Sequence, residues 1–92
     1  MITEIIPGHE YKCVDADVDV KFQNGTVHDV GRNGWQNDEL LEALIARINW
    51  LNKQFPCREN SITITKLEEA LMWQNKRTAD RIERKVEGKH VL

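Results

Sequence analysis

Cysteines are scarce, long apolar runs are missing, and the charges of the 92 residues nearly balance. The two cysteines, Cys13 and Cys57, are too few for a disulfide framework, so we expect thiols in a reducing compartment. No apolar run approaches the length of a membrane span or a signal-peptide core, which favours a cytoplasmic protein without a membrane partner. A formal charge of −2 argues against a protein that coats long nucleic acid by bulk electrostatics, and leaves a small anion as a ligand.

Motifs for catalysis and metal binding are missing as well. The sequence contains no Ser-His-Asp or Cys-His signature, no glycine-rich phosphate loop and no paired-carboxylate pattern. Its histidines and cysteines lack metal-ligand spacing, and the calcium-loop-like stretch 15–20 has Val20 where such a loop requires glycine. We therefore predict a protein that is not an enzyme, with no catalytic or metal-binding residues and no cofactor.

The composition is that of a soluble globular chain, with 40% hydrophobic and 30% charged residues. A chain of this length is expected to form a single domain over residues 1–92. Its core alone should be only marginally stabilising, because small domains bury a small fraction of their surface. We therefore expect a homo-oligomer.

The hydrophobic period changes once along the chain, and the two parts together predict an α+β fold. In the segment 14–22, apolar residues alternate with charged ones, which is the period of a half-buried strand. The dipeptide Asn24-Gly25 tolerates positive φ angles and should form a type I′ turn that places Phe22 opposite Val27. Residues 12–31 are therefore predicted to form a small N-terminal antiparallel β-hairpin.

The second part is predicted to be a two-helix antiparallel hairpin within residues 37–90. Its first helix should span 38–52 with Asn37 as its N-cap, and a Phe-Pro pair follows as a stop signal. Asn60 or Ser61 should cap the second helix, and Gly88 should stop it. The short connection forces the helices antiparallel. The stripes expected to face each other are Leu40, Leu44, Ile48, Leu51 and Phe55 on the first helix, and Ile64, Leu67, Leu71, Thr78 and Ile82 on the second.

Several side chains beside these stripes have the chemistry of a nucleotide pocket. Trp50 lies well off the apolar line, and Trp73, Arg77 and Arg81 form a row at i, i+4 and i+8. Guanidinium groups bind phosphate bidentately, and an indole offers a face to a purine. Basic residues are also favoured at helix C-termini by the helix dipole. The alternative is therefore an interaction protein that uses a basic helix face to bind a host protein or nucleic acid.

The stretches "LLEALIARINWLNKQFPCRENS" and "ITKLEEALMW…KRTADRIERKVEG" closely resemble the helical-hairpin domain of phage anti-defence sponges. This family includes the anti-Thoeris and anti-CBASS proteins that sequester cyclic nucleotides. The resemblance covers about residues 37–90, and its specific part is "FPCRENS" joined to "RTADR". The strand-forming insert at 12–31 is more similar to the anti-Thoeris branch than to the all-helical anti-CBASS branch.

The resemblance implies a protein that binds and holds a cyclic nucleotide immune signal without cleaving it. The implied ligand is glycocyclic ADP-ribose, the cyclic ADP-ribose isomer made by Thoeris TIR enzymes, with CBASS cyclic di- and trinucleotides as further candidates. Binding would occur in the cytoplasm of an infected bacterial host and would deprive a host effector of its signal. The family also implies a homo-oligomer in which dimers can build hexamers.

The resemblance also implies four ligand-binding residues and two departures from the family pattern. Trp50 would stack on a base and Asn60 would hydrogen-bond the adenine, while Arg77 and Arg81 would bind phosphates. We expect the alanine variants of Trp50, Arg77 and Arg81 to keep nearly unchanged stability. Trp73 should instead pack at a helix interface, so Trp73→Ala should lower stability. The departures are Gln74 and Lys85, which stand where an apolar residue and a glycine are expected.

Overall fold

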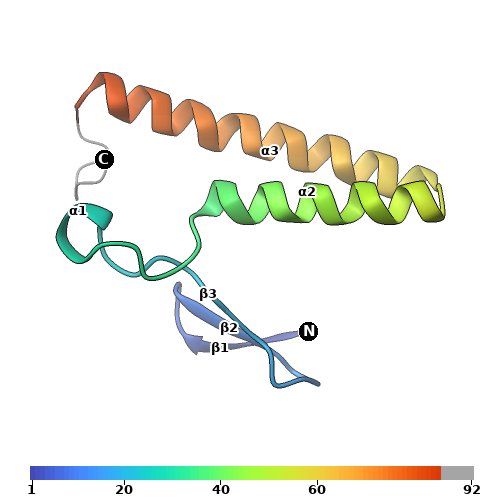
Figure 1. Ribbon diagram of the computed structural model, residues 1–92, viewed down its shortest axis with the longest axis horizontal. Helices are drawn as coiled ribbons and strands as arrows, with labels where there is room; N and C mark the ends of the chain where they lie inside the picture. The colour runs from blue at the N-terminus through green and yellow to red at the C-terminus, as the bar shows by residue number, and fades with distance from the viewer. Residues whose placement is uncertain (86–92) are drawn as a thin grey trace. The chain divides into compact units, whose positions relative to one another are not determined.

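The computed structural model describes residues 1–85, and an antiparallel sheet precedes two long helices in it (Figure 1). This order confirms the predicted α+β class. The described residues divide into two compact units, Met1–Gln36 and a helical unit that begins at Asn37. The predicted stop at Gly88 lies outside the described residues. The elements are β1 (Ile2–Ile6), β2 (Glu10–Cys13), β3 (Asp19–Lys21), α1 (Val27–Val30), α2 (Asn37–Gln54) and α3 (Arg58–Glu83).

The sheet has the order β1-β2-β3, and both neighbouring pairs are antiparallel. β1 and β2 are joined by a tight turn in which the His9 backbone N–H donates to the Ile6 carbonyl at 2.9 Å. Pro7 and Gly8 occupy the two central positions, and the φ of Gly8 is +78°, which fits a type II turn. Sequence analysis did not anticipate β1, because its residues show no clear alternation of apolar and polar side chains.

The predicted β-hairpin around Asn24-Gly25 is wrong. Only Asp19–Lys21 of the alternating segment is a strand, and it pairs with β2. The segment expected to return as a strand is instead the single-turn helix α1, so Phe22 and Val27 are not paired. The Thr26 hydroxyl explains this difference, because it accepts a hydrogen bond from the Asp29 backbone N–H at 3.2 Å and caps the turn.

Phe22 pairs instead with Trp35, in an isolated parallel bridge. The Trp35 N–H donates to the Lys21 carbonyl, and the Gln23 N–H donates to the Trp35 carbonyl, both at 2.9 Å. Gly34 permits this close approach, since a Cβ atom at that position would lie 2.5 Å from the Phe22 carbonyl carbon. Trp35 thus extends the hydrogen bonding beyond the end of β3.

α2 and α3 lie side by side and antiparallel, which confirms the predicted helical hairpin (Figure 1). Two of the residues assigned to the first apolar stripe do not belong to it, because Leu44 is 45% exposed and Phe55 is 79% exposed. Thr78 and Ile82, assigned to the second stripe, are likewise exposed. The half-buried leucine and isoleucine side chains that form the stripes are Leu40, Leu41, Ile45, Ile48 and Leu51 on α2, and Ile64, Leu67 and Leu71 on α3.

The predicted caps of both helices need correction. Asn37 is the first residue of α2 instead of its cap. α3 begins at Arg58, with Cys57 as the N-cap in an extended conformation, so neither Asn60 nor Ser61 is the cap. The Cys57 sulfur accepts a hydrogen bond from the Asn60 backbone N–H at 3.4 Å, the role that a hydroxyl or carboxylate usually fills.

Gln74, where the resemblance implies an apolar residue, has a polar partner. The Asn37 amide donates to the Gln74 side-chain oxygen at 3.5 Å, so two amides face each other where the apolar stripe ends. At the opposite end of the hairpin, the Asn52 amide donates to the Ser61 hydroxyl oxygen at 3.3 Å. Polar contacts therefore connect the two helices at both ends.

No hydrophobic side chain of residues 1–85 is fully buried, and Arg81 is the one residue of that range in the buried class. The described chain thus has a half-buried stripe in place of a closed core. Large apolar side chains, among them Met72 and Trp73, remain exposed on its surface.

Lys85 follows the last turn of α3 in a left-handed conformation, with φ of +58°. Because a side chain with Cβ is strained there, Lys85→Gly should raise the free energy of unfolding by about 1 kcal/mol. Urea denaturation at a fixed protein concentration measures the change. Lys85→Ala, which keeps Cβ, should give little or none of it, and an equal gain in both variants would contradict backbone strain as the cause.

Candidate functional site

The four ligand-binding residues implied by the resemblance all lie in the helical unit, but at two separate places. Trp50 and Asn60 flank the turn between α2 and α3, whereas Arg77 and Arg81 lie in the last turns of α3. Asn60 and Arg77 are 17 positions apart on one helix. At 1.5 Å per residue, their backbones are therefore about 25 Å apart. A single chain does not bring the four residues into one pocket.

At the turn, Trp50 is 58% exposed and lies on the side of α2 opposite to the side that packs on α3. This follows from its position 140–200° around the helix from the half-buried Ile45 and Ile48, at about 100° per residue. Asn60 is half-buried, and its side-chain amide makes no hydrogen bond to any other residue between 1 and 85. Both side chains can therefore accept a ligand.

A hydrogen-bonded network surrounds the backbone of Asn60. The Asn52 side-chain oxygen accepts from the Cys57 backbone N–H at 3.0 Å, and the Asn52 amide nitrogen donates to the Ser61 hydroxyl at 3.3 Å. The Ser61 hydroxyl in turn donates to the Cys57 carbonyl at 3.3 Å. Sequence analysis treated Asn52 only as the end of a helix, and no spacing rule would have identified it.

The row of Trp73, Arg77 and Arg81 does not share one environment. Trp73 is 68% exposed and Arg77 is exposed, whereas Arg81 is 5% exposed. Residues four apart on a helix are offset by about 40°, so Arg81 lies about 80° around α3 from Trp73. The expected packing of Trp73 at a helix interface is wrong for the contact between α2 and α3.

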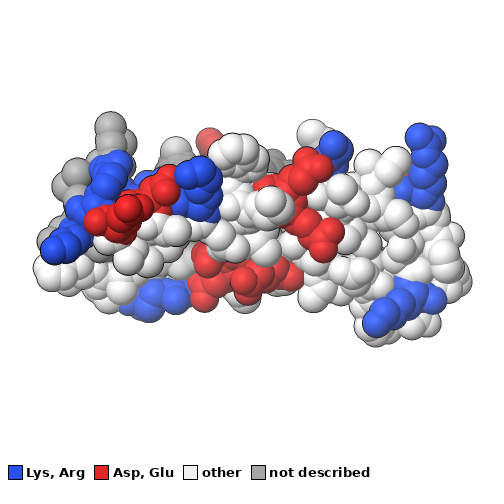
Figure 2. Space-filling model, turned by 90° about the horizontal axis from the view of Figure 1, so that it is seen from above, with Lys and Arg blue, Asp and Glu red and all other residues white. Residues whose placement is uncertain are grey.

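Arg77 makes no ion pair with any part of the chain that the structure describes, whereas its neighbour Lys76 does. The Lys76 ammonium lies 3.0 Å from an Asp80 carboxylate oxygen, one turn along α3. In the view onto α3, Lys and Arg gather toward the two ends, and Asp and Glu lie between them and beside them (Figure 2). The outer face of α3 thus carries mixed charge rather than a continuous basic surface.

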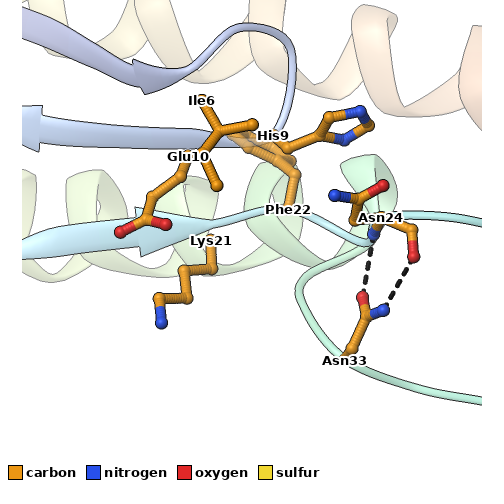
Figure 3. A pocket seen from close by; sticks show the side chains of 7 residues that line it. All are labelled: Ile6, His9, Glu10, Lys21, Phe22, Asn24 and Asn33. Atoms are coloured by element: carbon orange, nitrogen blue, oxygen red, sulfur yellow. Dashed lines mark hydrogen bonds between the residues drawn. The ribbon is translucent and has the colours of Figure 1, made fainter.

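The N-terminal unit contains a small hollow that sequence analysis did not anticipate. Its volume is about 200 Å³, which is below the 300–1,000 Å³ of usual ligand pockets. Glu10 and Lys21 lie on one side of it, and His9 and Asn24 on the other (Figure 3). The His9 Nδ1 atom is buried and has no hydrogen-bond partner among residues 1–85. The full lining is Ile6, His9, Glu10, Lys21, Phe22, Asn24 and Asn33.

Asn33 is committed to the backbone and is not available to a ligand. Its side chain accepts from the Asn24 N–H at 2.8 Å and donates to the Asn24 carbonyl at 2.7 Å (Figure 3). Within residues 1–85 no three His, Cys, Asp or Glu side chains cluster closely enough to hold a metal ion. None of the helices between residues 1 and 85 has the length and hydrophobicity of a transmembrane segment.

The helical hairpin matches a known family. The profile of the Acb2/Tad1 hairpin domain matches residues 15–79, which is more than half of the chain. The chain belongs to the Acb2/Tad1 hairpin family. The match includes Trp50, Asn60 and Arg77 but ends before Arg81.

The protein called Thoeris anti-defense 1, from Bacillus phage SBSphiJ7, is 54% identical to this chain over 72 residues. The aligned part is 77% of this chain and 51% of that protein, so the chain spans about half the length of this curated relative. The similarity confirms the resemblance to the anti-Thoeris branch of the family.

The different environments of the two arginines predict different effects on stability. Trp50→Ala and Arg77→Ala should each change the free energy of unfolding by less than about 0.5 kcal/mol, because both side chains are exposed. Arg81→Ala should lower it by about 1–3 kcal/mol through the loss of buried contacts. This corrects the expectation that both arginines can be removed without loss of stability.

Urea denaturation without ligand, at one protein concentration, measures all three variants. Arg84→Ala is the matched control, since Arg84 is exposed and close to Arg81 along the chain. Equal free energies of unfolding for Arg81→Ala and Arg84→Ala would show that the burial of Arg81 does not contribute to stability.

Proposed function

We propose that this chain is a phage anti-defence protein that sequesters a cyclic nucleotide immune signal in the cytoplasm of an infected bacterium. The proposed ligand is glycocyclic ADP-ribose from Thoeris TIR enzymes, which the protein holds intact. One observation carries the proposal. Trp50, Asn60 and Arg77, which suit a base face, a base edge and a phosphate, all lie within the family match and are not committed to other side chains of residues 1–85.

The chemistry of these groups favours binding without cleavage. Stacking of a base on an aromatic ring contributes about 1–3 kcal/mol, and a charged hydrogen bond to phosphate about 1.5–3 kcal/mol. An indole, an amide and a guanidinium bind but do not supply a nucleophile with an adjacent base. The proposed activity is therefore binding alone.

We further propose that each pocket is shared between two chains. A cyclic nucleotide is much smaller than the separation of about 25 Å between Asn60 and Arg77 in one chain. Two hairpins that lie antiparallel would bring the turn of one chain to the arginine end of the other. The same pairing would cover exposed apolar side chains such as Leu44, Met72 and Trp73. Dimers of this kind, and hexamers built from them, fit the expected assembly.

The alternative function, binding of a host protein or nucleic acid through a basic helix face, receives less support. Acidic side chains are mixed with the basic ones on the outer face of α3 (Figure 2), and Lys76 is paired with Asp80. Contacts to a phosphate backbone weaken steeply with salt. A desolvated pocket for one nucleotide should weaken less, so titrations at several salt concentrations separate the two functions.

The protein should release its ligand unchanged. The protein is incubated with glycocyclic ADP-ribose, separated from free ligand and then heated. We expect it to release the intact cyclic molecule, at close to one molecule per protein chain. Mass spectrometry of the released material identifies it. A linear or hydrolysed product above the level of a no-protein control would contradict sequestration.

A mixing experiment tests the shared pocket. Trp50→Ala and Arg77→Ala should each weaken binding at least about tenfold, as expected for the loss of one such contact. When the two variants are co-expressed, a mixed dimer has one pocket with both substitutions and one with neither. About one quarter of all pockets should then regain wild-type affinity.

Calorimetric titration of the co-expressed variants measures the recovered fraction. The control is Trp50→Ala with Arg77→Ala in the same chain, which should recover nothing. Failure of the co-expressed variants to recover any tight binding would show that each pocket lies within one chain.

A further inference from the structure

The Asn52 side chain connects the last turn of α2 to the first turn of α3. Its oxygen accepts from the Cys57 backbone N–H at 3.0 Å, and its nitrogen donates to the Ser61 hydroxyl at 3.3 Å. The Ser61 hydroxyl and backbone N–H both donate to the Cys57 carbonyl, at 3.3 and 3.2 Å. The three residues therefore form a closed hydrogen-bonded ring between the helices.

Asn60 lies within the segment that this ring encloses. It precedes Ser61 directly, and its backbone N–H donates to the Cys57 sulfur at 3.4 Å. Its backbone is therefore fixed by residues that Asn52 holds in place. Its half-buried side-chain amide, in contrast, makes no hydrogen bond within residues 1–85. A fixed backbone with an uncommitted side chain is the arrangement expected of a preorganised binding group.

We propose that Asn52 is a positioning residue for the ligand-binding amide of Asn60. This inference rests on the proposed function, since it concerns the same site. In the proposed role, Asn52 does not itself contact the nucleotide. It sets the direction of the Asn60 amide by holding Cys57 and Ser61, and through them the first turn of α3.

The amide chemistry of Asn52 is what this role requires. One side chain must accept from a backbone N–H and pair with a hydroxyl, and asparagine supplies both an acceptor and a donor. Leucine has a similar shape but neither group. Aspartate still accepts from Cys57, and the Ser61 hydroxyl can turn to donate to its second oxygen. Asn52→Asp should therefore rescue the function that Asn52→Leu removes.

Calorimetric titration with glycocyclic ADP-ribose tests the role through a double-mutant cycle. Asn52→Leu and Asn60→Ala should each weaken binding about tenfold, whereas Asn52→Asp should remain within about threefold of wild type. The variant that combines Asn52→Leu with Asn60→Ala should bind no more weakly than Asn60→Ala alone. This non-additivity is expected because Asn52 acts through the Asn60 amide.

Two further variants distinguish a loss of positioning from a general loss of structure. Asn49→Leu is the matched control, because the Asn49 amide donates only within its own helix, to the Ile45 carbonyl at 3.1 Å. It should bind as wild type does. Ser61→Ala opens the ring without changing α2, and it should weaken binding about threefold. This variant supplies the answer if Asn52→Leu fails to fold.

The possible failures are distinguishable. If wild type binds the nucleotide and Asn52→Leu binds it equally well, the positioning role is overturned and the proposed function stands. If Asn52→Leu does not fold, equal binding by Ser61→Ala gives the same conclusion. If Asn52→Leu weakens binding as much in the Asn60→Ala variant as in wild type, Asn52 does not act through the Asn60 amide, and the positioning role is again overturned. If wild type binds none of the cyclic nucleotide, the proposed function fails and the role of Asn52 fails with it.

Discussion

The contact between α2 and α3 is the interaction on which the rest of the helical unit depends. It consists of apolar side chains that recur at helical spacing and are half-buried, with no fully buried hydrophobic side chain among residues 1–85. Such a contact excludes water on one side of each helix only. Its free energy is correspondingly modest, since hydrophobic stabilisation scales with the apolar area removed from water. The helical hairpin is thus one layer, which the proposed assembly would cover with a second.

This incomplete burial explains why the surface carries side chains that a self-sufficient domain would cover. Met72 and Trp73 are more than half exposed, and each would bury a large area against a second hairpin. In the proposed assembly the same association that completes the core also completes the pocket. Stability and ligand binding would then depend on a single interface.

The helices were predictable from the sequence because the apolar period extends over many residues, and their antiparallel packing followed from a short connection. The β-hairpin was not predictable in the same way. Alternation in 14–22 favoured a long strand, but the Thr26 cap turned the next segment into a helix. Local hydrogen bonds and the bridge from Phe22 to Trp35 decided the outcome, and neither has a periodic signal.

For the candidate site, the residue types were visible from the sequence, but their surroundings were not. Trp50 and Arg77 were recognised because they lie off the apolar stripe. The burial of Arg81 and the network around Asn60 depend on contacts between residues, and composition does not reveal these. Cys57 was overlooked as a cap for a similar reason, since cysteine rarely fills that position.

The paired amides of Asn37 and Gln74 restrict how far α2 and α3 can slide along each other. Apolar stripes tolerate sliding by a full helical turn, because one leucine can replace another as a neighbour. Polar contacts do not tolerate it, and here they exist at both ends, through Asn37 with Gln74 and Asn52 with Ser61. The two helices are therefore held in a single axial register. This register fixes the distance along the hairpin between Trp50 and Arg77, and in the proposed assembly the partner chain would have to match that distance.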